Sequence, residues 1–302
     1  MRERSLVPEP EFESYYGRPV LKAPVWKQPD VPLYLFLGGY AGVSALIAEG
    51  AEATGRPGLS RVARLGAAAG AGLGTVALIH DLGRPERFLN MLRTFKVTSP
   101  LSVGSWVLAP FSSLASAAAL STVTGRLPLL GRAAGLGAAA LGGPLATYTA
   151  ALISNTAVPA WHDAYREMPF LFAGSAAAAA GGGALALSPL DESGPARTVA
   201  VAGTGVELVA HQLLHRRLGM VAEPYSQGRP GTLLRTARVL EGVGAVGAVL
   251  GRRSRTLSVL SGAALVAGSV LTRFGIFQGG VASAKDPKYT VVPQRERAAA
   301  RS

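Results

Sequence analysis

The segment from Phe172 to Leu187, FAGSAAAAAGGGALAL, has no charged side chain and consists mostly of alanine, glycine and leucine. A similar segment, LGAAAGAGLGTVAL, covers residues 65–78. Side chains this small bury too little apolar surface to stabilise a fold in water. In a lipid bilayer, by contrast, small residues let helix backbones approach closely. Both segments therefore predict membrane-spanning helices that pack through small residues.

The composition of the whole chain supports this interpretation. Of the 302 residues, 49% are hydrophobic and only 16% are charged, and the mean hydropathy is positive. The apolar residues occur in blocks of about 20, the length that crosses a hydrocarbon core of about 30 Å. We therefore expect an all-α, polytopic membrane helical bundle of about eight transmembrane helices, arranged as two four-helix bundles.

Eight spans follow from the apolar blocks, and their ends are approximate. They cover residues 31–50, 62–80, 100–122, 134–155, 168–188, 197–214, 232–250 and 256–277. This division predicts a polar N-terminal tail (1–30), a membrane domain (31–280) and a polar C-terminal tail (281–302). Within the membrane domain, we expect a first bundle over about 31–160 and a second over about 165–280.

Because the number of spans is even, both tails lie on one side of the membrane, which we call side A. The connections after the second, fourth and sixth spans lie on the same side. The connections on the opposite side, side B, are short. Lysine and arginine near the spans are more numerous on side A, so the positive-inside rule predicts cytoplasmic tails. The net charge of +12 lies in loops and tails, and no basic stretch is interleaved with aromatic residues, so we expect no nucleic-acid partner.

The histidines all fall on side A in this arrangement, and histidine titrates near neutral pH. They are His80, His162, His211 and His215. Proton exchange at this face is one interpretation, and tolerance of histidine at an interface is the other. Two of them are four residues apart on one helix, so they share a face and cannot ligate both faces of a haem. With no evident third metal ligand and no cysteine, we expect no haem, iron–sulfur cluster or metal site in this chain.

Several ionisable side chains lie inside predicted spans, where charge is costly and each such residue is a functional candidate. Glu207 and His211 share a face of the sixth span, and Arg273 lies in the eighth. We consider these three a possible proton relay. Arg238 and Glu241 are spaced to pair along the seventh span. An ion pair that only holds helices together is the structural alternative for these carboxylates.

Residues 78–91, LIHDLGRPERFLNM, contain the end of the second span and the turn after it. A glycine can end that helix, and Pro85 can begin a short helix lying in the membrane interface. Asp81 would then lie at the mouth of the bundle beside Arg84. Together with His80, this cluster suits a quinone headgroup and its protons. A turn held together by its own salt bridge explains the same residues equally well.

Several segments resemble the NrfD family, the membrane subunits of polysulfide-reductase-type complexes. The strongest are DLGRPERFLNML (81–92) and TSPLSVGSW (98–106). LYLFLGGYAG (33–42) resembles the opening of the family's first span, and residues 148–181, beginning YTAALISNTAVPAWHD, resemble its fourth-to-fifth span segment. The segment DPKYTVVPQR (286–295) is similar to a tail seen in some members.

This resemblance implies a quinone-interacting integral membrane subunit that passes electrons between an iron–sulfur partner subunit and the menaquinone pool. It implies a ferredoxin-like iron–sulfur subunit and a molybdopterin catalytic subunit as partners, and menaquinone or another quinone as an exchangeable cofactor. It also implies a multi-pass protein of the bacterial inner (cytoplasmic) membrane. The chain would be an oxidoreductase subunit, either non-catalytic or carrying the quinone site.

The family's quinone pocket lies in the first four-helix bundle. Carried onto this chain, it draws on Asp81, Arg84 and Tyr148, with His80 and Asn155 beside them. The Tyr148 hydroxyl would donate to a quinone carbonyl, although a tyrosine simply packed between helices is equally common.

Two other functions are compatible with this composition. A secondary transporter would place its polar residues at the bilayer midplane between inverted repeats, whereas here they gather at one face. A passive membrane anchor would need no cluster of aspartate, histidine and arginine.

Overall fold

A computed structural model describes residues 20–84 and 86–300. All regular secondary structure within these residues is helical. The elements are α1 (Asp30–Ala53), α2 (Pro57–Leu82), α3 (Glu86–Met91), α4 (Pro100–Thr124), α5 (Pro128–Ser154), α6 (Pro159–His162), α7 (Met168–Leu187), α8 (Gly194–Leu218), the 3-10 helix η1 (Gly219–Tyr225), α9 (Gly228–Leu250), α10 (Arg255–Lys285) and α11 (Lys288–Ala299). The all-α prediction is confirmed. Residues 1–19 and 301–302 of the predicted tails, and Pro85, lie outside the described residues.

Each of the eight predicted spans corresponds to one long helix. Six of these helices, α1, α2, α4, α5, α7 and α10, are long and apolar enough to cross a membrane. Helices α8 and α9, of 25 and 23 residues, are long enough but more polar. The protein is thus a multi-pass helical membrane protein, and a total of eight spans stays a prediction.

Local sequence signals set several helix ends. Ser99 caps α4, because its hydroxyl accepts a hydrogen bond from the Ser102 amide at 3.4 Å, and Pro100 occupies the first turn. This is the start predicted for the third span. Gly83 ends α2 with a φ of 71°, a left-handed conformation that glycine adopts without strain. The chain therefore turns sharply directly after His80 and Asp81.

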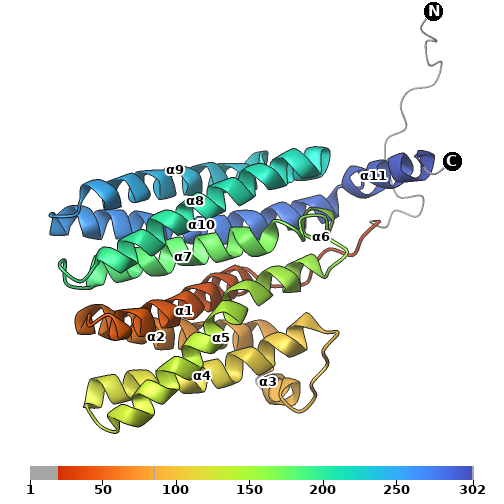
Figure 1. The fold of residues 1–302 in the computed structure, drawn as a ribbon. Helices are drawn as coiled ribbons and strands as arrows, with labels where there is room; N and C mark the ends of the chain where they lie inside the picture. The colour runs from red at the N-terminus through yellow and green to blue at the C-terminus, as the bar shows by residue number, and fades with distance from the viewer. Residues whose placement is uncertain (1–19, 85, 301–302) are drawn as a thin grey trace, which may run out of the picture.

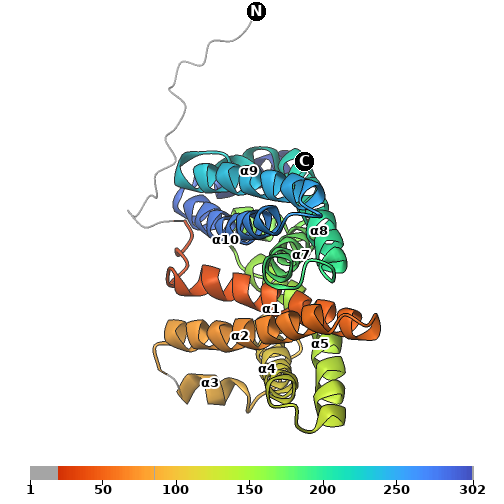
Figure 2. The same ribbon diagram turned by 90° about the vertical axis from the view of Figure 1, so that its left-hand side faces the viewer.

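The long helices form two groups (Figure 1). Helices α1, α2, α4 and α5 pack around one another, and α7, α8, α9 and α10 form the second group. Within the first group, α1 lies on the side that faces the second group, where it contacts α7 and α10 (Figure 2). The connections after α2, α5 and α8 lie at the same end of the molecule as α11 (Figure 1). This end corresponds to side A, and the connections after α1, α4, α7 and α9 lie at side B.

Glycine allows the closest approaches between these helices. A Cβ atom on Gly42 of α1 would lie 2.4 Å from the carbonyl oxygen of Gly142 of α5, and one on Gly142 would lie equally close to the Gly42 oxygen. A Cβ on Gly262 of α10 would lie 2.3 Å from the carbonyl oxygen of Gly182 of α7. Gly182 belongs to the alanine- and glycine-rich segment 172–187. Its contact confirms that this segment packs through small residues.

Labelling of single cysteines would establish whether α8 and α9 cross the membrane. The exposed residues Asp191 and Gln227 flank α8, and the natural chain contains no cysteine. In intact cells, a membrane-impermeant maleimide is expected to label Asp191→Cys and Gln227→Cys from opposite sides. Arg126→Cys, in the connection between α4 and α5, should label from the same side as Asp191→Cys. Labelling of all three from one side would show that α8 does not span.

Candidate functional site

A polar cluster joins the end of α2 to the segment that precedes α1. His80 Nδ1 lies 2.8 Å from the Asp30 carboxylate. The Asp81 carboxylate accepts a hydrogen bond of 2.9 Å from the Lys27 backbone amide, and the Lys27 ammonium donates to the His80 carbonyl oxygen at 3.4 Å. The His80 side chain is 74% exposed, whereas that of Asp30 is only 12% exposed. The cluster thus has an exposed imidazole supported by a nearly buried carboxylate.

Arg84 does not take part in this cluster. The pair that we expected between Asp81 and Arg84 is not formed in the described part of the chain, and the Arg84 side chain is exposed. The reason is the turn at Gly83: Asp81 still lies on α2, facing the Lys27 amide, while Arg84 lies beyond the turn. The alternative interpretation, in which a salt bridge between Asp81 and Arg84 holds the turn together, is therefore wrong.

The short helix expected after this turn is present as α3, whose described residues are all exposed or half-buried. Leu89 is exposed, while Phe88 packs against the apolar core. Farther along, Phe95 meets Trp106 of α4 edge to face at 5.7 Å, and both are exposed. Exposed aromatic and aliphatic side chains at this position are typical of a segment in the membrane interface.

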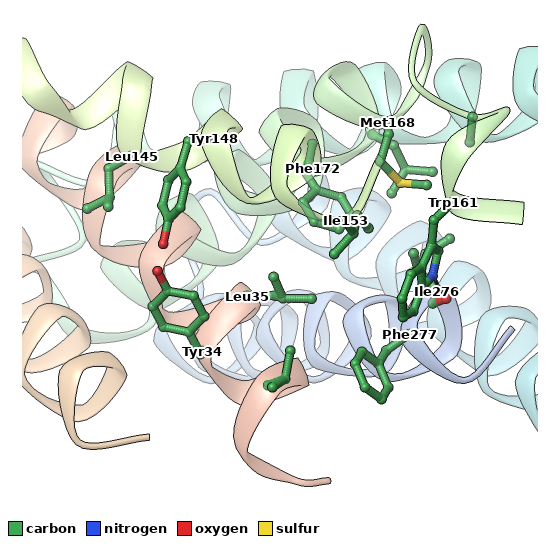
Figure 3. Close-up of a cluster of buried hydrophobic side chains, with 14 of the residues drawn as sticks. Tyr34, Leu35, Leu145, Tyr148, Ile153, Trp161, Met168, Phe172, Ile276 and Phe277 are labelled. Carbon is green, nitrogen blue, oxygen red and sulfur yellow. Dashed lines mark hydrogen bonds between the residues drawn. The ribbon is translucent and has the colours of Figure 1, made fainter. Parts of the chain in front are cut away.

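Tyr148 of α5 is buried against Tyr34 of α1, with the ring centroids 6.3 Å apart and the rings nearly perpendicular. Figure 3 shows the two hydroxyl groups pointing toward one another. No described residue forms a hydrogen bond with the Tyr148 hydroxyl, although its oxygen is buried. Gly104 of α4 makes room for the ring, because a Cβ there would lie 2.1 Å from Tyr148 Cε2. The first group of helices thus contains a buried phenol with an unused donor.

Asn155 ends α5 and is exposed. The connection that follows it lines a cavity of about 360 Å³ together with residues 21–26. Trp26 stacks on Trp161 across a centroid distance of 5.6 Å, and the buried Trp161 indole donates to the Ile276 carbonyl oxygen at 2.9 Å. Trp26 is next in sequence to Lys27, so the cavity and the His80–Asp81 cluster share one segment.

Sequence reasoning missed four residues of this region: Lys27, Asp30, Tyr34 and Trp161. Tyr34 lies in the LYLFLGG segment, and Asp30 directly precedes the first span, so both had a signal in the sequence. The role of Lys27 had none, because its contact to Asp81 uses a backbone amide.

A second polar cluster lies inside the α7–α10 group. Glu207 of α8, Glu241 of α9 and Arg273 of α10 are buried, and Arg273 interacts electrostatically with both carboxyl groups. The Arg273 guanidinium also donates to the Phe172 carbonyl oxygen at 2.7 Å and stacks 3.7 Å above the Phe172 ring. Glu241 does not form the predicted ion pair with Arg238 within the described chain, because Arg238 lies on an exposed face of α9.

His211, the third predicted member of the relay, is buried and packs against the ring of His215 at a centroid distance of 4.5 Å. Its Nε2 atom has no hydrogen-bond partner among the described residues. No group of three potential metal ligands occurs in the described ranges. Of the predicted relay, the structure thus brings Glu207 and Arg273 together, while His211 pairs with another histidine.

Ion pairs at side A attach the C-terminal helix. The Lys288 ammonium donates to the Glu223 carboxylate at 3.0 Å, and the Tyr289 hydroxyl donates to the same carboxylate at 3.2 Å. The hydrogen bond from Lys288 lowers the pKa of Glu223 and raises the pKa of Lys288. Both groups are therefore charged throughout the neutral range, and this exposed ion pair, one of several contacts of α11, weakens when acid protonates Glu223 or strong base deprotonates Lys288.

These features define a class: a multi-pass helical membrane protein with a polar site at one end of its first helices. A sequence model of the NrfD family, described as polysulphide reductase, matches residues 22–190, which is more than half of the chain. The chain therefore belongs to the NrfD family, as its motifs predicted. Comparison with curated proteins gives no significant match. The family match ends after α7, so Glu207, Glu241 and Arg273 lie outside it.

Proposed function

We propose that this chain is the quinone-interacting subunit of its complex. Membership of the NrfD family makes it a membrane subunit of a polysulfide-reductase-like oxidoreductase complex. The observation that carries the finer proposal is the buried hydroxyl of Tyr148, which has no hydrogen-bond partner among the described residues. A buried donor without an acceptor is costly, and a ligand carbonyl would satisfy it. Menaquinone or a related quinone offers such a carbonyl, and when bound it would supply chemistry of two electrons and two protons.

The residues at side A then have separate roles. Tyr148 donates to a quinone carbonyl oxygen and orients the ring. The Asp30 carboxylate accepts from His80 Nδ1–H, which leaves Nε2 as the atom that takes up and releases a proton at the exposed face. Asp81 fixes the segment 20–29 over the end of α2. Arg84 and Asn155, both exposed at this end, are available to the quinone path or to a partner.

Electrons must pass between this site and another subunit, because the chain has no cysteine to ligate a cluster. We infer a ferredoxin-like iron–sulfur subunit as the direct partner and a molybdopterin subunit as the catalytic one. The first bundle, about 31–160, would carry the quinone site in the bacterial inner membrane, with the tails cytoplasmic.

Proton conduction is a second candidate role, assigned to the second bundle, about 165–280. Glu207, Glu241 and Arg273 come from three helices and are buried without a full set of hydrogen bonds in the described chain. Such intramembrane groups are typical of proton relays. His211 would extend the relay toward side A, where His215 lies beside it.

Binding of a menaquinone analogue to the full chain in lipid nanodiscs tests the quinone site. Tyr148→Phe keeps the ring against Gly104 but removes the donor, so we expect about tenfold weaker binding, the value of roughly one hydrogen bond. The control is Tyr165→Phe, which changes an exposed tyrosine outside the bundle. Unaltered affinity of Tyr148→Phe would remove Tyr148 from the site. If the natural chain binds no analogue, it serves as a passive anchor.

A further inference from the structure

A second cavity, of about 640 Å³, opens at side B, the end of the molecule opposite the His80–Asp81 cluster. It lies where α8 begins, between the connection from α1 to α2 and the connection from α9 to α10. Its lining includes Arg56, Arg197 and Arg252 together with Thr198, Val201 and Val249. The cavity thus draws its charge from both groups of helices.

The positive charge of this cavity is not compensated within the described chain. None of Arg56, Arg197 and Arg252 forms an ion pair there, and no carboxylate lines the cavity. Arg252 is close enough to Arg197 to interact with it electrostatically, and this interaction is a repulsion. Glu192, on the nearby α7–α8 connection, instead accepts a hydrogen bond from the Leu59 amide at 2.8 Å. An anion placed among the three guanidinium groups would relieve the repulsion.

Arg197 is held in position before any ligand arrives. Its side chain is largely buried, with 9% of the residue exposed. Its Nε donates to the Ala248 carbonyl oxygen at 2.7 Å, and Nη2 donates to the Ser193 hydroxyl at 3.3 Å. These bonds fix the guanidinium at the wall of the cavity, so little conformational entropy is lost when an anion binds. The start of α8 adds the positive end of a helix dipole.

Apart from Thr198, the remainder of the lining is apolar and continues along the exposed surface of α9. Val201 and Ala202 of α8 and Val249 of α9 belong to the cavity wall. Beyond them, Val246 and Leu250 of α9 are 60% and 75% exposed. A free inorganic anion gains nothing from such a wall. A molecule with a phosphate at one end and acyl chains at the other matches both parts of the cavity.

We propose that this cavity binds the headgroup phosphate of an anionic phospholipid, with the acyl chains lying along α8 and α9. Basic pockets between transmembrane helices are known to bind headgroups of this kind. Because Arg56 belongs to the α1–α2 connection and the other two arginines to the second group, the lipid bridges the two groups at side B. The quinone site at side A is separate from it.

The proposal is tested by measuring the binding of phosphatidylglycerol to the full chain. Native mass spectrometry of the protein released from detergent detects the bound lipid. Arg56→Gln with Arg252→Gln removes one half-buried and one exposed charge and leaves Arg197 and its hydrogen bonds in place. At about fivefold per charge, we expect about 30-fold weaker binding. The matched control, Arg126→Gln with Arg132→Gln, removes two exposed charges from the α4–α5 region at the same end of the molecule. It should bind like the natural chain.

Three further measurements make the outcome decisive. Arg56→Lys with Arg252→Lys keeps the charge and should retain most of the affinity, which separates recognition from misfolding. Phosphatidylcholine should bind far more weakly, and millimolar inorganic phosphate should not compete. Equal loss in both glutamine pairs, equal binding of phosphatidylcholine, or competition by inorganic phosphate at the affinity of the lipid would each overturn the proposal.

Discussion

Arg273→Met is expected to lower the free energy of unfolding by about 3–5 kcal/mol, the usual cost of removing one partner from a buried ionic cluster. The residue is completely buried, and its guanidinium is the cation that acts on both Glu207 and Glu241. Methionine keeps an unbranched apolar stem, so the change removes the guanidinium with its charge, its hydrogen bond to the Phe172 carbonyl oxygen and its stacking on the Phe172 ring. Two buried carboxyl groups would then face one another without that cation.

Unfolding in mixed detergent micelles, followed by tryptophan fluorescence, would measure this loss. Arg238→Met is the matched control, because Arg238 is an exposed arginine of the same helix group, and it should change stability by less than about 0.5 kcal/mol. Adding Glu207→Gln and Glu241→Gln to Arg273→Met should restore part of the stability, since no uncompensated carboxyl remains. A cost below about 1 kcal/mol for Arg273→Met alone would show that the three groups act independently.

The helices were predictable because their signals are local. An apolar block of sufficient length ends where polar residues begin, and Ser99 with Pro100 sets the start of α4 within two residues. Even α8 and α9, which contain arginine and glutamate, lie where the apolar pattern placed them. The sequence also suggested a division into two bundles, but the pattern holds no information on which helix of a bundle faces which.

The site was only partly predictable, because its contacts join distant residues. Asp81 bonds to an amide 54 positions away, and His80 to a carboxylate 50 positions away. Arg84, three positions from Asp81, was the partner that sequence spacing favoured, but the turn at Gly83 prevents the contact. For Glu241 too, the partner in space differs from the neighbour in sequence. Arg238 is three residues away along α9, but the cation that interacts with Glu241 is Arg273 of α10.

Gly142→Ala is expected to destabilise the protein by about 1–3 kcal/mol, whereas Gly143→Ala should cost much less, since only the following Pro144 disfavours a Cβ there. The two glycines are adjacent in α5 and the substitution is identical. A Cβ on Gly142 would lie 2.4 Å from the Gly42 carbonyl oxygen, but a Cβ on Gly143 meets no atom of another helix within 4 Å. Because the obstructing atom belongs to the backbone of α1, no side chain can rotate away, and the two helices must separate.

This separation should also reach the candidate quinone site, because α1 carries Tyr34 and α5 carries Tyr148. The two rings meet edge to face at 6.3 Å, and moving α5 away from α1 would displace the Tyr148 hydroxyl. We therefore expect Gly142→Ala to weaken binding of a menaquinone analogue in nanodiscs, while Gly143→Ala binds like the natural chain. Loss of stability in Gly142→Ala with full affinity would mean that the quinone does not depend on the position of Tyr148. Equal stability of the two variants would mean that α1 and α5 tolerate a wider spacing than their reciprocal glycine contact implies.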